Sequence, residues 1–213
     1  MGIFFSKNKR NKGAIVSGDI KYHNLTDWWL NELTLEERNR IREVYKPMSS
    51  SDREYFIDEG NIEYSSCSDL GFIGGLAGWF QKVQDYEIAE KILKKGNEII
   101  SNNENILDEH FFYLSGIRVY YKNREKKEGS LDKAIYYCNK QIEISKLSKE
   151  GFLHEYPKSL LPEHTGYKQL AIIYEKNKNY QKALTLSKRA LSEGWSGDWE
   201  KRIARLEKKL NSQ

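Results

Sequence analysis

The sequence lacks the features that mark a membrane, fibrous or disulfide-linked protein. No run approaches the roughly 18 consecutive apolar residues of a membrane-spanning helix, and the mean hydropathy is −0.77. Only 3 prolines and 15 glycines occur among 213 residues, which excludes a collagen-like or proline-rich chain. Cys67 and Cys138 show no C-x-x-C spacing. We interpret both as buried small side chains in a reducing compartment, with a disulfide between them as the alternative.

Motifs for catalysis and for phosphate binding are also missing. The chain contains neither G-x-x-x-x-G-K-[ST] nor a G-x-S-x-G elbow, although it has four nearby glycines at Gly71, Gly74, Gly75 and Gly78. No H-E-x-x-H spacing joins the four histidines, which are His23, His110, His154 and His164. We therefore predict no enzyme, no cofactor and no metal. A metal-dependent enzyme built from the neighbouring His and Glu residues is the less favoured alternative.

The excess of positive charge is confined to the first twelve residues. They hold Lys7, Lys9, Arg10 and Lys12 and no acid, whereas residues 13–213 carry 31 basic and 31 acidic side chains. A nucleic-acid-binding fold would carry its basic residues as a stripe on the fold. We therefore expect no nucleic-acid partner.

The first residues show no secretory signal, because their apolar stretch is three residues long where 7–15 are needed. We therefore predict a cytoplasmic protein. The start, Met1-Gly2-Ile3-Phe4-Phe5-Ser6, matches the M-G-x-x-x-S pattern of N-myristoylation. A weak membrane tether through residues 1–12 thus stands beside the simpler interpretation, an ordinary flexible tail, and the pattern does not decide whether Gly2 is lipidated.

Three regions follow one another along the chain. Residues 1–24 are predicted to be a basic flexible tail with an irregular lead-in, and residues 25–69 an N-terminal helical cap with a linker. In that cap, Thr26 and Thr34 are candidate helix N-caps, and Glu37 lies three residues after Thr34 as in a capping box. Residues 70–213 carry a repeated pattern.

That pattern consists of small and aromatic residues at one fixed offset. The first set is Ala77, Phe80, Tyr86, Ala89, Leu93 and Gly96. A second set lies 94 residues further along, at Ala171, Tyr174, Tyr180, Ala183, Ser187 and Ala190. A looser middle copy, with six residues inserted in its turn, comprises Gly116, Val119, Leu131, Ala134, Cys138 and Gln141. Small residues let neighbouring helices approach closely, so the pattern predicts packed helix pairs. Asp85 and Ser130 are candidate N-caps of the second helices.

The pattern resembles the tetratricopeptide repeat (TPR), a helix–turn–helix unit of about 34 residues. The strongest stretches are residues 167–174 and 179–184. The resemblance implies an all-α, right-handed solenoid with repeats at 70–103, 109–148 and 164–197, an insertion at 149–163, and a capping helix at 198–211 that starts after Asp198. An unrelated helical bundle is the alternative. The proline that the family carries near the end of each repeat is absent, and Trp195 occupies that place in the third repeat.

In TPR proteins, the first helices of the pairs line a concave groove that binds peptides or proteins. The resemblance therefore implies a non-enzymatic adaptor that binds a protein or peptide, with a peptide-responsive sensor as the alternative. The implied groove residues are Gly74, Gly78, Gln81, Lys82, His110, Tyr113, Ile117, Tyr120, Tyr121, Lys168, Ile172 and Glu175. Gly74 and Gly78 either leave the groove floor open or mark a close helix contact. We expect Tyr113 or Tyr120 to be a binding hot spot, with core packing of the tyrosines as the alternative. The sequence indicates neither the partner's identity nor the oligomeric state.

Overall fold

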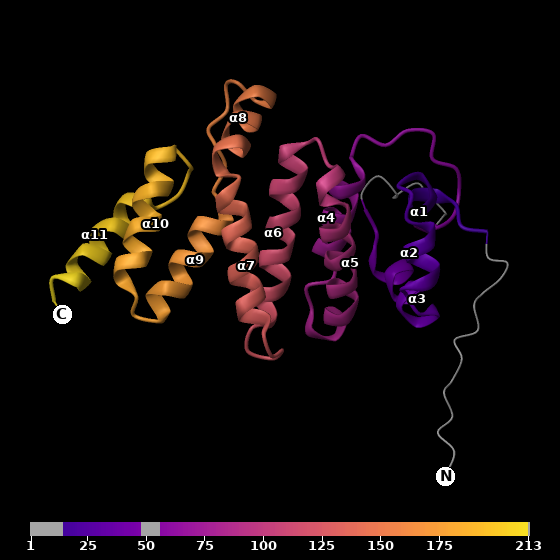
Figure 1. Ribbon diagram of the computed structural model, residues 1–213, viewed down its shortest axis with the longest axis horizontal. Helices are drawn as coiled ribbons and strands as arrows, with labels where there is room; N and C mark the ends of the chain where they lie inside the picture. The colour runs from indigo at the N-terminus through magenta and orange to yellow at the C-terminus, as the bar shows by residue number, and fades with distance from the viewer. Residues whose placement is uncertain (1–14, 48–55, 213) are drawn as a thin grey trace, which may run out of the picture. The chain divides into compact units, whose positions relative to one another are not determined.

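The computed structural model describes residues 15–47 and 56–212, and every regular element within them is a helix, apart from one isolated backbone bridge between Glu163 and Ser196. The all-α prediction is therefore confirmed for this part of the chain. Two compact units can be separated, residues 1–66 and residues 67–213, whose helices are labelled in Figure 1. None of the described helices is both long enough and apolar enough to cross a bilayer. The predicted tether at residues 1–12 lies outside the described residues.

The first unit contains three short helices, α1 (Gly18–Tyr22), α2 (Thr26–Asn31) and α3 (Leu35–Val44). The predicted capping box is present, because the Thr34 side chain accepts from the Glu37 amide at 3.1 Å and Glu37 accepts from the Thr34 amide at 2.8 Å. Asp58 joins the elements of this unit. It accepts from the Trp29 indole at 3.1 Å and from Arg42 Nε at 2.9 Å, and its hydrogen bonds and charge raise the pKa of Arg42.

Two details of the first unit differ from the sequence interpretation. The lead-in at 13–24 was predicted to be irregular, but it contains α1. This helix forms because Gly18 adopts a φ of 58°, and its amide donates to the Gly60 carbonyl oxygen at 2.9 Å. Any Cβ at Gly18 would overlap the backbone of Glu59. Thr26 is the first residue of α2 and not its N-cap, which is Leu25.

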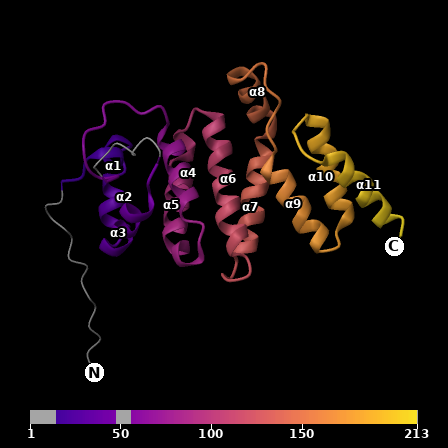
Figure 2. The ribbon, with the colours of Figure 1, turned by 180° about the vertical axis from the view of Figure 1, so that it is seen from behind.

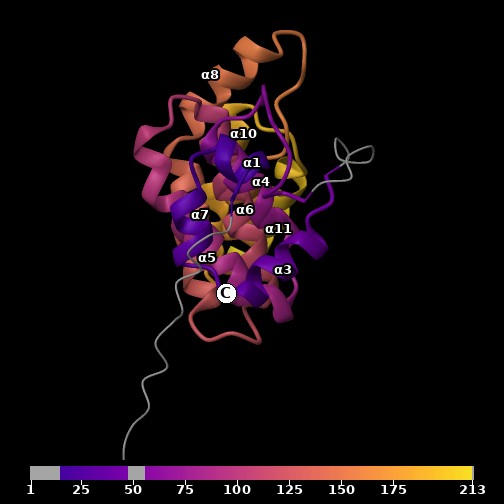
Figure 3. The same cartoon turned by 90° about the vertical axis from the view of Figure 1, so that its right-hand side faces the viewer.

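The second unit is a succession of longer helices. They are α4 (Asp69–Trp79), α5 (Tyr86–Ile99), α6 (Ile106–Asn123), α7 (Ser130–Glu143), α8 (Ser145–Glu155), α9 (Thr165–Lys176), α10 (Tyr180–Glu193) and α11 (Trp199–Leu210). Short 3₁₀ turns, η2 (Val83–Asp85) and η3 (Ile100–Asn102), flank α5. Within this unit the helices follow one another side by side in Figures 1 and 2, while α8 projects beyond its neighbours, as Figure 3 also shows.

Small residues lie where these helices are closest. Ala77, Ala89, Ala183 and Ala190 are fully buried. A Cβ at Gly96 would overlap the Phe112 ring, and one at Gly116 would overlap the Tyr137 ring. The helices can therefore pack this closely only because small residues occupy these positions.

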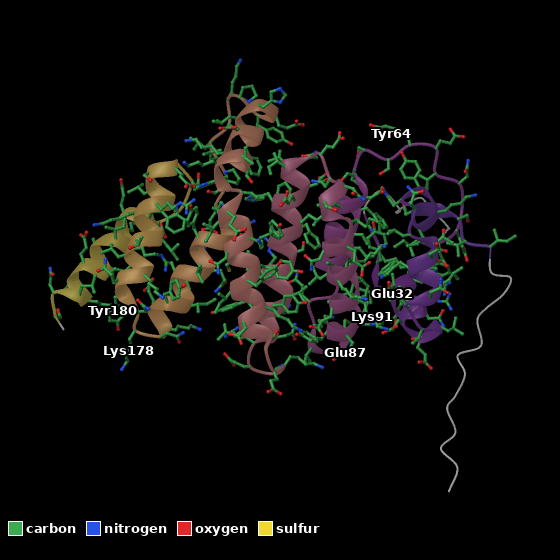
Figure 4. The ribbon with its side chains drawn as sticks, in the orientation of Figure 1. Glu32, Tyr64, Glu87, Lys91, Lys178 and Tyr180 are labelled. Carbon is green, nitrogen blue, oxygen red and sulfur yellow. The ribbon has the colours of Figure 1, made fainter. Side chains whose placement is uncertain are left out.

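The helix starts are less regular than predicted. Ser130 is the first residue of α7, and the N-cap is Gly129, which has a φ of 70°. The Ser130 hydroxyl instead donates to the Tyr120 carbonyl oxygen at 2.9 Å. Asp85 and Asp198 occupy N-cap positions, but neither side chain accepts a capping hydrogen bond. At the turn between α9 and α10, Lys178 has a φ of 57°, and Figure 4 shows its side chain pointing away from the helices.

The two cysteines differ in their environments. Cys138 is buried, as predicted, and burial raises the pKa of its thiol to about 12. Cys67 is exposed, so its predicted burial is wrong: it lies in the segment before α4 and not inside a helix pair. The structure does not pair them in a disulfide.

The predicted insertion and capping helix both contribute buried residues. In the segment 149–163, Phe152 and Leu161 are buried, although α8 already begins at Ser145. At the C-terminal end, Leu206 of α11 joins a buried cluster with Ala171, Ala183 and Leu184. The last helix therefore covers the apolar flank of α9 and α10.

Candidate functional site

The predicted groove residues separate into a buried and an accessible group. The buried group consists of Gly74, His110, Tyr113, Ile117 and Tyr120. A Cβ on Gly74 would lie 3.1 Å from the Phe112 Cα. Gly74 is thus a close contact between α4 and α6, which is the second of the two interpretations considered for it.

The two expected aromatic anchors belong to the helix core in this structure. Tyr113 is 6% exposed and its hydroxyl donates to Glu109 at 2.9 Å. Tyr120 is 5% exposed and its ring lies against Tyr86 and Tyr137, at centroid distances of 6.0 and 5.5 Å. Burial raises the pKa of both phenols above its ordinary value. Neither residue presents a free ring face to a partner, because α6 has neighbours on most of its sides.

The accessible group lies along three helices or at their ends. It consists of Gly78, Gln81, Lys82, Tyr121, Lys168, Ile172 and Glu175. Some of these side chains already have partners within the unit: Lys168 pairs with Glu163 at 2.7 Å, and Glu175 pairs with Arg202 and Arg205 of α11. Tyr121 lies between two cations, with Arg124 at 4.1 Å and Lys176 of α9 at 5.9 Å from its ring.

Accessible residues recur at one spacing on α4, α6 and α9. The spacing is i, i+4, i+7, with a fourth residue at i+11 on α6 and α9, and the residues are Gly71, Gly75 and Gly78; Phe111, Ser115, Arg118 and Lys122; and Thr165, Gln169, Ile172 and Lys176. Such residues share one side of a helix. We call these eleven residues the α4–α6–α9 face.

The stripes of α4 and α6 adjoin, because a Cβ on Gly78 would lie 3.8 Å from Ser115 Oγ. Lys176 of α9 approaches the ring of Tyr121, the neighbour of Lys122 on α6. Two exposed side chains of the face could bind a ligand. Arg118 is exposed and makes no hydrogen bond or ion pair with the described residues. Phe111 is 47% exposed. The side-chain nitrogen of Gln169 is buried without a partner among the described residues.

The sequence interpretation missed Gly75, Phe111, Ser115, Arg118 and Gln169. On α6 it placed the accessible stripe one residue too early, at His110, Tyr113 and Ile117. The glycines of α4 were the available signal, because Gly71, Gly75 and Gly78 share one side of that helix.

The predicted groove residue His110 forms a buried pair with His164. His110 and His164 are 3% and 0% exposed, and their ring centroids lie 5.2 Å apart. His110 Nδ1 and His164 Nε2 have no hydrogen-bond partner among the described residues. Burial lowers the pKa of His110 to about 4, and burial together with His110 lowers the pKa of His164 to about 3. Residues 15–47 and 56–212 contain no group of three or more side chains placed to hold a metal ion.

Comparison with known proteins yields no relative for this chain: no family model, no curated protein and no solved structure matches it.

Proposed function

We propose that residues 67–213 form a TPR-like helical repeat array that binds a peptide segment of another protein along the α4–α6–α9 face. The order of helix contacts supports this proposal. Helix α4 packs against α5 and α6, α6 against α7, α9 against α7 and α10, and α11 against α10. Equivalent stripes on the first helices of three pairs are expected of a stack of repeats.

The observation that carries the proposal is the bare surface of α4. A glycine inside a helix costs about 0.5–1 kcal/mol relative to alanine. A Cβ on Gly75 would have no neighbour within 4 Å, and one on Gly78 would meet only Ser115 at an ordinary contact distance. Helix packing therefore requires glycine at neither position. A ligand that lies directly on the α4 backbone would require it at both.

The rest of the face supplies the contacts that a peptide needs. Phe111 offers an apolar surface beside this bare stripe, and Arg118 offers an unpaired guanidinium one turn beyond Ser115. Aromatic and arginine side chains are enriched among interface hot spots.

A peptide-display screen on the full chain tests this function. A random 12-residue library is selected on the immobilised protein, and the enriched peptides are resynthesised for fluorescence anisotropy. We expect the affinity to fall at least 10-fold in Arg118→Glu, which reverses the charge on the face, and in Gly75→Trp, which fills the bare stripe.

The matched control is Lys146→Glu, which makes the same charge reversal at an exposed position of α8 outside the face. This variant should bind like the wild type. Enriched peptides that bind Arg118→Glu and Gly75→Trp with full affinity would place the site elsewhere. Failure to enrich any peptide above an uncoated surface would count against peptide binding itself.

A further inference from the structure

A buried cluster of rings joins four elements of the second unit. His110 comes from α6, Phe152 from α8, His164 from the N-cap of α9, and Trp195 from the loop between α10 and α11. The His110 ring lies 5.3 Å from Phe152 and is stacked on Trp195 at 5.9 Å with an interplanar angle of 20°. His164 lies 4.7 Å from Trp195. The two histidines are therefore at the centre of this junction.

His164 performs its structural role only while it is neutral. Its Nδ1 accepts a hydrogen bond from the Tyr167 amide at 3.3 Å and thereby caps α9. A neutral imidazole has one donor and one acceptor nitrogen, so its proton is on Nε2, which has no partner among the described residues. A second proton must go to Nδ1. An imidazolium cannot accept a hydrogen bond, so protonation removes the cap.

The acidic groups next to the two histidines already have partners. Beside the histidines in sequence, or linked to the cluster by hydrogen bonds, are Glu109 of α6, Glu163 before α9, Tyr167 and Lys168 of α9, and Arg189 and Glu193 of α10; Asp108 of α6, Cys138 of α7 and Lys149, Glu150, His154 and Glu155 of α8 are on the elements packed around them. Glu109 accepts from Tyr113, and Glu163 pairs with Lys168.

Glu193 is the carboxylate most closely tied to this cluster, and it is already engaged. Its oxygens accept from Tyr167 at 2.9 Å, from Arg189 at 2.9 Å and from the Trp195 indole at 3.0 Å. These donors hold the pKa of Glu193 below its ordinary value. The charge of Glu193 favours protonated His164, but one carboxylate that is already paired with Arg189 cannot balance two buried imidazolium ions 5.2 Å apart.

We propose that this junction is an acid-operated switch, in which protonation of His164 and His110 releases α8 and the segment 156–163 from α6 and from the start of α9. The released elements are those held by the histidine rings. Phe152 attaches α8 to His110, and the Ser196 amide donates to the Pro162 carbonyl oxygen at 3.2 Å beside Trp195. The remaining packing between α4, α5 and α6 contains no histidine and stays closed.

Hydrogen–deuterium exchange of the full chain at pH 7.5 and pH 5.0 measures this opening, with labelling times scaled for the slower intrinsic exchange in acid. A histidine that regains the ordinary pKa of about 6.5 in the open state shifts the equilibrium about 30-fold toward that state at pH 5.0. The equilibrium constant for opening α8 and the first turn of α9 should therefore increase about 30-fold for each histidine released. The amides of α4 and α5 should not change.

The variant His110→Phe/His164→Asn removes both titrating groups and keeps a ring at position 110. Asparagine at position 164 also keeps a side-chain acceptor for the α9 cap. This variant should lose the increase in exchange at pH 5.0. An equal increase in the variant, or no increase in the wild type, would overturn the proposal.

A second measurement uses only the wild type, in case the double variant does not fold. Proton NMR follows the imidazole signals of His110 and His164 during a pH titration. Both signals should titrate well below the ordinary imidazole pKa of about 6.5. Titration of both rings at that ordinary pKa would contradict the switch. The peptide screen measures binding at pH 7.5, where both rings are neutral, whereas the exchange experiment measures the response to acid, so either proposal can fail without the other.

Discussion

Helix α6 packs against its neighbours in two different ways. Toward α4 and α5 the contact is mainly apolar: Gly74 and Gly96 bring the helices onto Phe112, and only at the end of α6 does a buried polar side chain, Asn123, donate to the Gln81 carbonyl oxygen at 3.1 Å. Toward α9 the contact is polar. Gln141 of α7 donates to the His110 carbonyl oxygen at 2.9 Å and accepts from the Gly166 amide at 2.6 Å. The first side depends on shape and the second on hydrogen bonds and protonation.

The largest expected effect concerns acid, which should act on the polar side only. The pKa values of His110 and His164 are lowered in the folded protein, to about 4 and about 3, so the unfolded chain binds more protons once the pH falls below about 6.5. The contribution of the two neutral histidines to the free energy of unfolding is complete above pH 6.5 and is lost as the pH falls toward their pKa values in the folded protein. Urea unfolding followed by circular dichroism should show a loss of about 4 kcal/mol between pH 7.5 and pH 5.0 that is absent from His110→Phe/His164→Asn. An equal loss in that variant would assign it to other groups.

The next-largest loss of stability is expected at the contact between α5 and α6. In Gly96→Leu the new side chain overlaps Phe112 and Ile73, so we expect the free energy of unfolding to fall by about 3 kcal/mol. Denaturant titration measures it. Gly75→Leu is the matched control, because its side chain would enter open space. Equal stability of the two variants would mean that the α5–α6 approach is not as close as described.

A smaller effect should come from the bridging amide on the polar side. Gln141→Leu leaves the His110 carbonyl oxygen and the Gly166 amide without their side-chain partner. Loss of these bonds should lower the free energy of unfolding by about 2 kcal/mol. Gln181→Leu on the exposed side of α10 makes the same change of residue and should have little effect. If both variants matched the wild type, water would be replacing the bridge.

The smallest effect should appear at the surface glycine of α4. Gly75→Ala adds a methyl group that meets nothing within 4 Å and should raise the free energy of unfolding by about 0.5–1 kcal/mol. The same denaturant titration detects this gain. A loss of stability instead would show that Gly75 is required by packing, and the argument for a bare ligand surface would then fail.

The apolar side could be predicted from sequence and the polar side could not. Ala77 of α4 and Ala89 of α5 recur 94 residues later as Ala171 and Ala183, because helix approach depends on side-chain size, which a pattern of small residues reveals directly. The histidine cluster has no such pattern. His110 and Trp195 are far apart in sequence, and their contact depends on how α8 and the segment after it fold back onto the helix pairs.

The register of α6 was misjudged for a related reason. A helix with neighbours on one side shows a wide polar face, but α6 packs against α4, α7, α8 and α9. Only the narrow stripe with Phe111, Ser115 and Arg118 stays accessible. Tyrosines and histidine, which occur both in cores and at interfaces, give little help in locating so narrow a stripe. The Thr34 capping box was predictable because its two partners are three residues apart.

The outer side of α11 has a consequence for self-association. Its inner residues Trp199 and Leu206 are buried, whereas Lys201 and Lys208 are exposed on the opposite side. Two copies meeting through a symmetric contact of this surface would bring four cations together and strip them of water. Like charges in such a contact repel, and desolvation adds to the cost. The exposed side of α11 therefore disfavours a symmetric tail-to-tail dimer.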